Sequence, residues 1–124
     1  MNTWTNDELN KIGAAEELLL ASLRGDGTLR KPVTIWVVRL DNDLFVRAVN
    51  GRDSAWFRGT QVRHEGHIQA GGIDKDVSFV EAEPGINDRI DAVYRSKYRR
   101  YATSIVNSVL THEARASTIR LVPR

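Results

Sequence analysis

The sequence predicts a single α+β domain, residues 1–124, built around a mostly antiparallel sheet. The chain has 124 residues, of which 41% are hydrophobic and 27% charged, as in ordinary globular domains. A helical segment comes first, strand-like segments separated by turns follow, and further helical segments with one more strand complete the pattern. No apolar run approaches the ~18 residues that cross a bilayer, so we expect no membrane segment.

The N-terminal part predicts a helix followed by a strand. Asn6-Asp7-Glu8-Leu9 offers a polar cap and acids in the first turn, and Ile12 continues the helical spacing. The apolar run that begins at Glu17 ends at Gly25-Asp26-Gly27-Thr28, a hairpin signal. The helix is therefore expected to give way to a strand near Glu17.

The rest of the sheet is predicted from β-branched and alternating segments joined by turns. Val33 to Leu40 is almost continuously apolar, so we expect one strand with both faces covered. Gly71-Gly72 lies near the bend of a later hairpin. The expected strands after the first are 33–40, 44–49, 67–72, 75–82 and 118–123.

Three further helices are expected. Asp53 or Ser54 is placed to cap a short helix over residues 55–58. A longer helix over 88–101 carries Tyr94, Tyr98 and Tyr101 on one face, and a shorter helical stretch covers 104–110. The tyrosine face predicts that the longer helix packs on the sheet.

The net charge of +2 hides a segmental pattern. Residues 24–63 and 84–124 each carry eight of the 18 basic residues, whereas residues 1–23 and 64–83 are acidic. Fourteen of the 18 bases are arginine, whose planar fork suits phosphate and carboxylate. The pattern indicates an anionic partner, although solvated surface arginines would give the same composition.

Several classes of site are excluded or disfavoured. The absence of cysteine excludes disulfides, thiolate metal sites and a cysteine nucleophile. His64 and His67 are three residues apart with a glycine between them, and His112 is distant, so we expect no metal. The start of the sequence has neither a basic nor an apolar leader region, so we expect a cytoplasmic protein.

Five stretches carry a resemblance to known families: Gly27-Thr28-Leu29-Arg30-Lys31-Pro32-Val33-Thr34-Ile35-Trp36-Val37-Val38, Leu44-Phe45-Val46-Arg47, Gly51 with Ser54-Ala55-Trp56-Phe57-Arg58, Asp76-Val77-Ser78-Phe79, and Tyr94-Arg95-Ser96-Lys97-Tyr98. Together they resemble the bacterial family numbered 2255 among the domains of unknown function, over nearly the whole chain. Their order is also similar to the flavin-binding split barrels, which include pyridoxamine-phosphate oxidase relatives and deazaflavin-dependent nitroreductases. The resemblance implies a small split β-barrel, mostly antiparallel, with an N-terminal and a C-terminal helix packed on it, and a homodimer.

The same resemblance implies a site for a flavin-type cofactor, FMN or a deazaflavin. Basic side chains and the start of the short helix would hold its phosphate, because a helix N-terminus offers free N–H groups. Trp36 and Trp56 would border the ring. The implied phosphate ligands are Arg30, Lys31, Arg52 and Ser54.

Other interpretations of these residues stay open. The oxidase relatives have a Ser-Arg-Lys type of turn where this chain has Arg52-Asp53-Ser54, and the acid weakens a phosphate site. The turn could simply cap a helix, with Arg52 in solvent. Trp36 and Trp56 could equally fill the core.

The leading functional hypothesis is a cofactor-binding protein acting as a reductase, with the redox chemistry supplied by the cofactor. No residue is identified as a catalytic acid or base. The alternative is a non-catalytic binding or structural dimer module that has lost the cofactor. A nucleic-acid partner ranks last, because the bases of residues 95–100 fall mostly on a different helix face from the tyrosines and no RNA-binding signature accompanies them.

Overall fold

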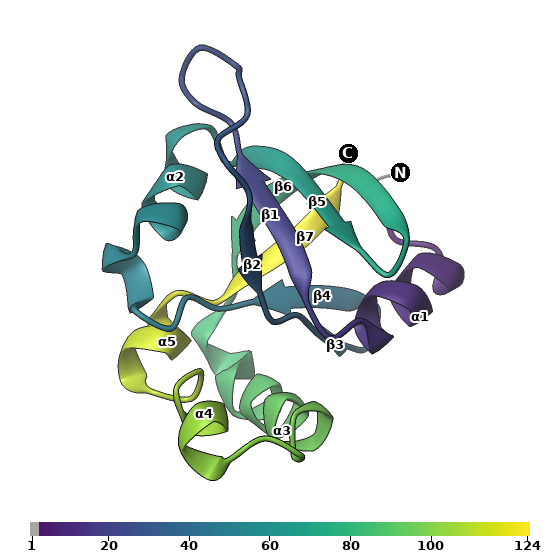
Figure 1. Cartoon of the computed structure of the whole chain (residues 1–124), viewed down its shortest axis with the longest axis vertical. Coiled ribbons are helices and arrows are strands. Elements are labelled where there is room, and N and C mark those ends of the chain that lie inside the picture. The colour runs from purple at the N-terminus through teal and green to yellow at the C-terminus, as the bar shows by residue number, and fades with distance from the viewer. Residues whose placement is uncertain (1–2) are drawn as a thin grey trace.

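The computed structural model describes residues 3–124 as a curled sheet with helices at its ends and lower side (Figure 1). The strands are β1 (Leu18–Ser22), β2 (Val33–Ile35), β3 (Val38–Leu40), β4 (Asp43–Val46), β5 (Glu65–Ala70), β6 (Ile73–Glu81) and β7 (Ile119–Pro123). The α-helices are α1 (Asn6–Ala14), α2 (Ala55–Arg63), α3 (Asn87–Lys97), α4 (Thr103–Asn107) and α5 (His112–Ala116), and the 3-10 helices are η1 (Gly51–Asp53) and η2 (Pro84–Ile86). The α+β architecture expected from the sequence is confirmed.

The sheet order is β2-β1-β5-β6-β7-β4-β3, and every pairing between these strands is antiparallel. The two edge strands, β2 and β3, are separated along the chain by only Trp36 and Val37. One short segment therefore supplies both edges of the curled sheet, which is the geometry of a split barrel.

This segment corrects the prediction of one strand over 33–40. The strand breaks at Trp36 and Val37, and its first half pairs with β1 while its second half pairs with β4. Two side chains at the end of α3 bind the backbone at the break. The Val37 N–H donates to the hydroxyl of Tyr98, the C-cap, at 3.2 Å, and Lys97 Nζ donates to the Val37 carbonyl at 2.6 Å. The expectation that both faces are covered is also wrong, since Thr34 is exposed.

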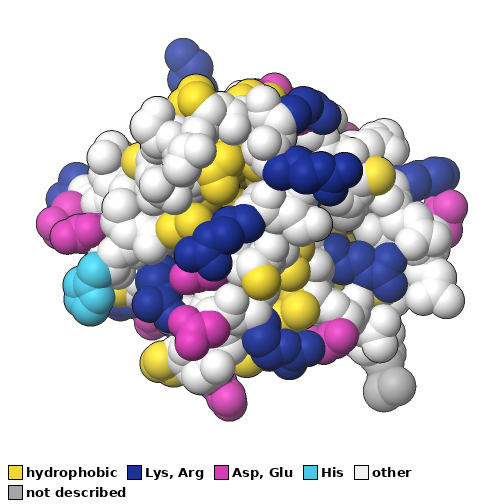
Figure 2. Space-filling view, turned by 90° about the horizontal axis from the view of Figure 1, so that it is seen from below, with side chains coloured by type: hydrophobic (Ala, Val, Ile, Leu, Met, Phe, Trp, Pro, Cys, Tyr) yellow, Lys and Arg dark blue, Asp and Glu magenta, His cyan; other side chains and the backbone are white. Residues whose placement is uncertain are grey.

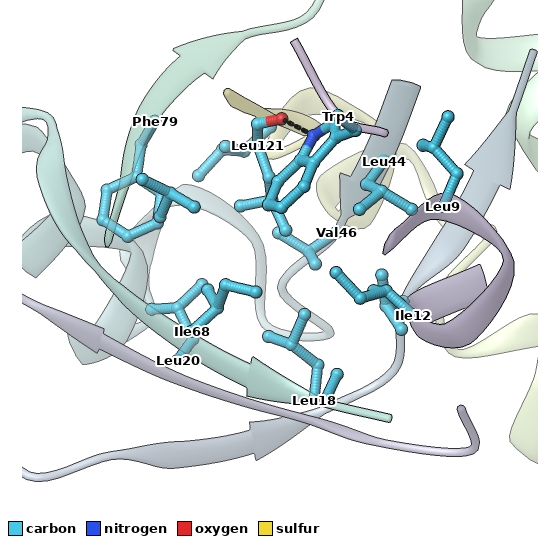
Figure 3. Close-up of a cluster of buried hydrophobic side chains, with 14 of the residues drawn as sticks. Trp4, Leu9, Ile12, Leu18, Leu20, Leu44, Val46, Ile68, Phe79 and Leu121 are labelled. Carbon is cyan, nitrogen blue, oxygen red and sulfur yellow. Dashed lines mark hydrogen bonds between the residues drawn. The ribbon is translucent and has the colours of Figure 1, made fainter. Parts of the chain in front are cut away.

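The interior of the barrel is a mainly aliphatic cluster (Figure 3). Leu20 from β1, Ile68 from β5 and Leu121 from β7 meet there, and each is at most 1% exposed. The indole of Trp4 closes one end and donates through Nε1 to the Leu121 carbonyl at 2.9 Å. Residues near the start of the described chain are thereby fixed to the last strand.

A second cluster, which we call the aromatic cluster, lies between α3 and the opposite face of β3 and β4. It is formed around Val38, Phe45, Ile90, Tyr94, Tyr98, Val106 and Val109. Alternation along β4 sends Phe45 to this cluster and its neighbours Leu44 and Val46 to the barrel interior. The tyrosine face of α3 thus packs on the sheet, as its spacing predicts.

The helix ends differ from the sequence expectation in several places. The cap of α1 is Thr5, which forms a capping box with Glu8. The helix expected over 55–58 continues to Arg63, the long helix ends at Lys97 instead of Tyr101, and α5 was not expected. Within residues 3–124, no helix combines the length and apolar character needed to span a bilayer.

Candidate functional site

A groove of about 430 Å³ opens between β2, the chain after β4, the start of α2 and α4. Both predicted ring-binding residues, Trp36 and Trp56, and one of the four predicted phosphate ligands, Ser54, line it together. The remaining lining residues are Glu17, Val33, Thr34, Ile35, Arg47, Val49, Asn50, Ile105, Ser108 and Val109. The fold therefore brings residues from widely separated parts of the sequence to one surface depression.

The groove wall is largely apolar and includes two indoles. Trp36 stacks on Tyr98 of the aromatic cluster, with ring centroids 3.8 Å apart and planes inclined by 4°. Trp56 is partly buried and packs against the barrel interior. Val49 and Ile105 add aliphatic surface and are 51% and 48% exposed. Such a wall suits a flat, largely uncharged ring system.

The cation in the groove wall, Arg47, is not free to bind a ligand. Its Nε donates to Thr118 at 2.9 Å, Nη1 donates to Asp91 and to the Val109 carbonyl, and Nη2 donates to the Asn87 carbonyl and side chain. These bonds engage all five N–H groups of the guanidinium. Arg47 consequently ties β4 to α3 and to the chain after α4.

Arg30 is positioned differently. Its side chain lies against Gly59 of α2, where an added Cβ would stand 3.1 Å from Arg30 Cδ and Nε and 2.7 Å from Ser22 Oγ. The buried Nε has no hydrogen-bond partner among residues 3–124. Gly59 follows Trp56 by three residues, so this contact lies about 4.5 Å along the helix axis from the groove residue Trp56.

Two other predicted phosphate ligands lie near the start of α2 and of β2. Ser54 is the N-cap of α2, but its hydroxyl donates to the Gly51 carbonyl at 3.0 Å instead of accepting from a helix N–H. The α2 N-terminus therefore keeps N–H groups without a side-chain cap. Lys31 is exposed and immediately precedes the segment that leads into the groove wall.

Arg52 is placed away from the groove lining. Its guanidinium pairs with Glu81 of β6, donates to the Ala116 carbonyl at 3.2 Å and covers the Phe57 ring at 5.0 Å. The hydrogen bond with Glu81 raises the pKa of Arg52. The sequence prediction placed Arg52 and Ser54 at one phosphate site. In the structure, Ser54 lines the groove, whereas the Arg52 side chain lies against β6.

The groove contains residues that sequence reasoning did not single out. Ile105, Ser108 and Val109 come from α4 and the turn after it, and Glu17 comes from the chain before β1. Their distance in sequence from Trp36 and Trp56 hides their shared position. Val49, at the end of the predicted strand 44–49, carried no sequence signal that set it apart from the other strand residues.

The three histidines are not grouped as a metal site. His64 adopts a left-handed conformation at the end of α2, with φ of 57°. His67 on β5 bonds through both ring nitrogens, to Asp76 at 2.8 Å and to Asp74. The Asp76 bond, followed by Asp74, raises the pKa of His67 against the opposing effect of burial. Among residues 3–124, no group of three or more metal-binding side chains is positioned around a common point.

The basic residues of the C-terminal region are dispersed. Figure 2 views the side on which α3, α4 and α5 lie, and Lys and Arg side chains are spread over it with acidic side chains between them. Arg115 pairs with Asp88, and Arg89 pairs with Asp41. This mixture of signs is typical of a solvated surface.

Comparison with solved structures finds a similar fold in several proteins. An F420-H2 dependent reductase, FDR-A, superposes with a TM-score of 0.62 at 15% identity, covering 86% of this chain and 93% of that one. A candidate pyridoxamine 5'-phosphate oxidase from Listeria innocua gives 0.64 at 13% identity, covering 96% and 92%. A FAD-binding protein from Mesorhizobium loti gives 0.56 at 16% identity, covering 98% and 89%.

At identities this low, the superpositions show a shared split-barrel fold and no more. Curated proteins provide no match to the sequence. The family model described as "Uncharacterized protein conserved in bacteria (DUF2255)" matches residues 8–121. Because that match spans all seven strands except the end of β7, the chain belongs to the DUF2255 family.

Proposed function

We propose that this protein binds a flavin-type cofactor, FMN or a deazaflavin, in the groove between Trp36 and Trp56. The observation that carries the proposal is the groove itself, which brings Trp36 and Trp56 together with Ser54 at the start of α2, where the Ser54 side chain does not cap the helix. The free N–H groups at the start of a helix bind a phosphate well. The residues present therefore fit a ring that carries a phosphate chain.

Each part of the chain has a distinct role in this proposal. Trp36 and Trp56 hold the ring and exclude water from its face, while Arg30, Lys31 and the uncapped start of α2 bind the phosphate. Arg52 stays outside the proposed site because Glu81 engages it. When bound, the cofactor supplies the capacity to carry a hydride.

We further propose that the protein acts as a cytoplasmic reductase and as a homodimer. The similarity of fold to an F420-H2 dependent reductase supports the reaction class. The exposed aliphatic side chains of Val49 and Ile105 at the groove rim support the second copy, which would cover them and enclose the ring.

The test is a fluorescence titration of the purified protein with FMN, FAD and a deazaflavin. We expect one of them to bind, and Arg30→Ala to weaken that binding by about 10- to 100-fold, as expected for a charge-assisted bond. Arg89→Ala, which removes an exposed arginine paired with Asp41, is the matched control and should bind like the wild type.

Two outcomes would contradict the proposal at different levels. Equal affinity of Arg30→Ala and wild type would show that Arg30 does not bind the cofactor, while binding in the groove would still be supported. Failure of all three compounds to bind would leave the alternative, a binding or structural module without cofactor.

A further inference from the structure

Aromatic rings continue from the groove wall toward the molecular surface. Trp36 stacks on Tyr98 and also lies 5.1 Å, centroid to centroid, from Tyr101. Tyr98 and Tyr101 are 6.0 Å apart, and Tyr94 is 6.2 Å from Tyr98. Tyr94 and Tyr98 are fully buried, whereas Tyr101 is partly exposed just beyond α3. Trp36 thus contacts both the groove and a tyrosine that reaches solvent.

The two tyrosines next to Trp36 differ in what accepts their hydroxyl protons. Tyr101 donates to the Glu16 carboxylate, at 2.6 Å from Oε1. Tyr98 donates only to backbone carbonyls, those of Glu16 at 2.8 Å and Val37 at 3.1 Å. A carboxylate within hydrogen-bond reach can take a proton, whereas a backbone carbonyl cannot hold one near neutral pH. Burial also raises the pKa of Tyr98.

The surroundings of Glu16 keep its carboxylate in place. Arg100 pairs with Glu16 and also covers the Tyr101 ring at 5.4 Å. The cation near the ring disfavours a positive charge on Tyr101, so loss of an electron from this ring requires loss of its proton as well. Tyr101 and Glu16 together have the geometry of a proton-coupled electron donor.

We propose that Trp36, Tyr101 and Glu16 form a one-electron relay that carries oxidising equivalents from the groove to the surface. The relay rests on the proposed function for the identity of the oxidant in the groove, a photo-excited flavin-type ring. Its own geometry does not depend on that ligand. The relay would protect the groove, because the radical is transferred from Trp36 to Tyr101, which reductants in solution can reach.

The electrons and protons balance in three steps. Trp36 gives one electron to the oxidant, which is reduced by one electron, and the indole becomes a radical cation. Tyr101 gives one electron to Trp36 while its O–H bond breaks and the proton forms an O–H bond on Glu16. A thiol or ascorbate then returns one electron to the Tyr101 radical, and Glu16 returns the proton.

Pulse radiolysis of the protein without added cofactor tests the relay directly. Azide radicals oxidise tryptophan, and the decay of the tryptophyl absorption is compared with the growth of the tyrosyl absorption. We expect intramolecular transfer in the wild type, no tyrosyl growth in Tyr101→Phe, and transfer slowed by about a hundredfold in Glu16→Gln, which keeps a hydrogen-bond acceptor but loses the base. Trp36→Phe should also lose the transfer, which separates Trp36 from Trp4 and Trp56.

Tyr94→Phe is the matched control. It removes a hydroxyl from the same cluster that has no hydrogen-bond partner among residues 3–124, so transfer and folding should both be retained. Circular dichroism of each variant confirms the fold. Tyrosyl growth in Tyr101→Phe equal to that of the wild type would overturn the relay, whether or not a flavin binds. Failure of flavin binding with intact transfer would instead overturn the proposed cofactor alone.

Discussion

The two hydrophobic clusters differ in how they tolerate polarity. The barrel interior is mainly aliphatic. Among its residues drawn in Figure 3, one side-chain hydrogen bond is marked, from the Trp4 indole to the Leu121 carbonyl. The aromatic cluster contains two buried tyrosines and adjoins the buried pair of Arg47 and Asp91. Aliphatic packing depends mainly on the shape of the side chains, whereas a buried polar network requires particular donor and acceptor atoms at particular positions. The groove lies beside the aromatic cluster, which has such a network.

The buried ion pair offers the largest effect. Asp91→Ala should lower the free energy of unfolding by about 4 kcal/mol, because it leaves the Arg47 guanidinium buried without its carboxylate. Urea denaturation measures the loss. Asp88→Ala removes an exposed acid of the same helix that pairs with Arg115, and should cost less than about 1 kcal/mol. Similar losses of unfolding free energy for both variants would show that the Arg47–Asp91 pair contributes no more to stability than an exposed ion pair.

The barrel interior offers the next effect. Leu20→Ala should cost about 3 kcal/mol in the same measurement, since the side chain is 1% exposed and its loss leaves a cavity. Leu19→Ala, on the same strand with 38% exposure, is the control and should cost a fraction of that value. We expect Leu20→Ala to leave cofactor affinity in the folded protein unchanged, whereas substitutions in the aromatic cluster should lower it. If both kinds of substitution lowered the affinity equally, the two clusters would not differ in their effect on the groove.

A third effect is a pH dependence. Burial lowers the pKa of Lys97 to about 8 from 10.5, so between these values the unfolded chain binds more protons than the folded one. Stability should therefore rise with pH across that window, through this group. The difference in unfolding free energy between wild type and Lys97→Met, measured from about pH 8 to about pH 10, should show the slope. If the difference in unfolding free energy did not change with pH, Lys97 would not be the source of the pH dependence.

Sequence patterns predicted the order of the elements apart from α5 and the division of the strand over 33–40, because turns and alternation are local. They did not predict the break at Trp36 and Val37, because a continuous apolar run looks the same whether a strand keeps its partner or changes it. The pairing of Arg47 with Asp91 was equally invisible, since it joins residues 44 positions apart.

The same limit applies to the groove. Trp36, Ser54 and Trp56 line it together because the local order of strand, turn and helix places them, while their binding of a cofactor stays a prediction. Arg52 differs because its partner Glu81 lies on β6, 29 residues away. The packing of Arg30 against Gly59, which leaves its Nε without a hydrogen-bond partner among residues 3–124, is encoded by no local pattern.

The position of β7 in the sheet bears on synthesis. This strand lies between β6 and β4, so it alone joins the two parts of the sheet by backbone hydrogen bonds. A chain leaving the ribosome cannot complete the barrel before residues 119–123 emerge, and Trp4 must wait for Leu121. Until then the apolar faces of the earlier strands stay open to other chains, so chaperone demand should be greatest in that interval.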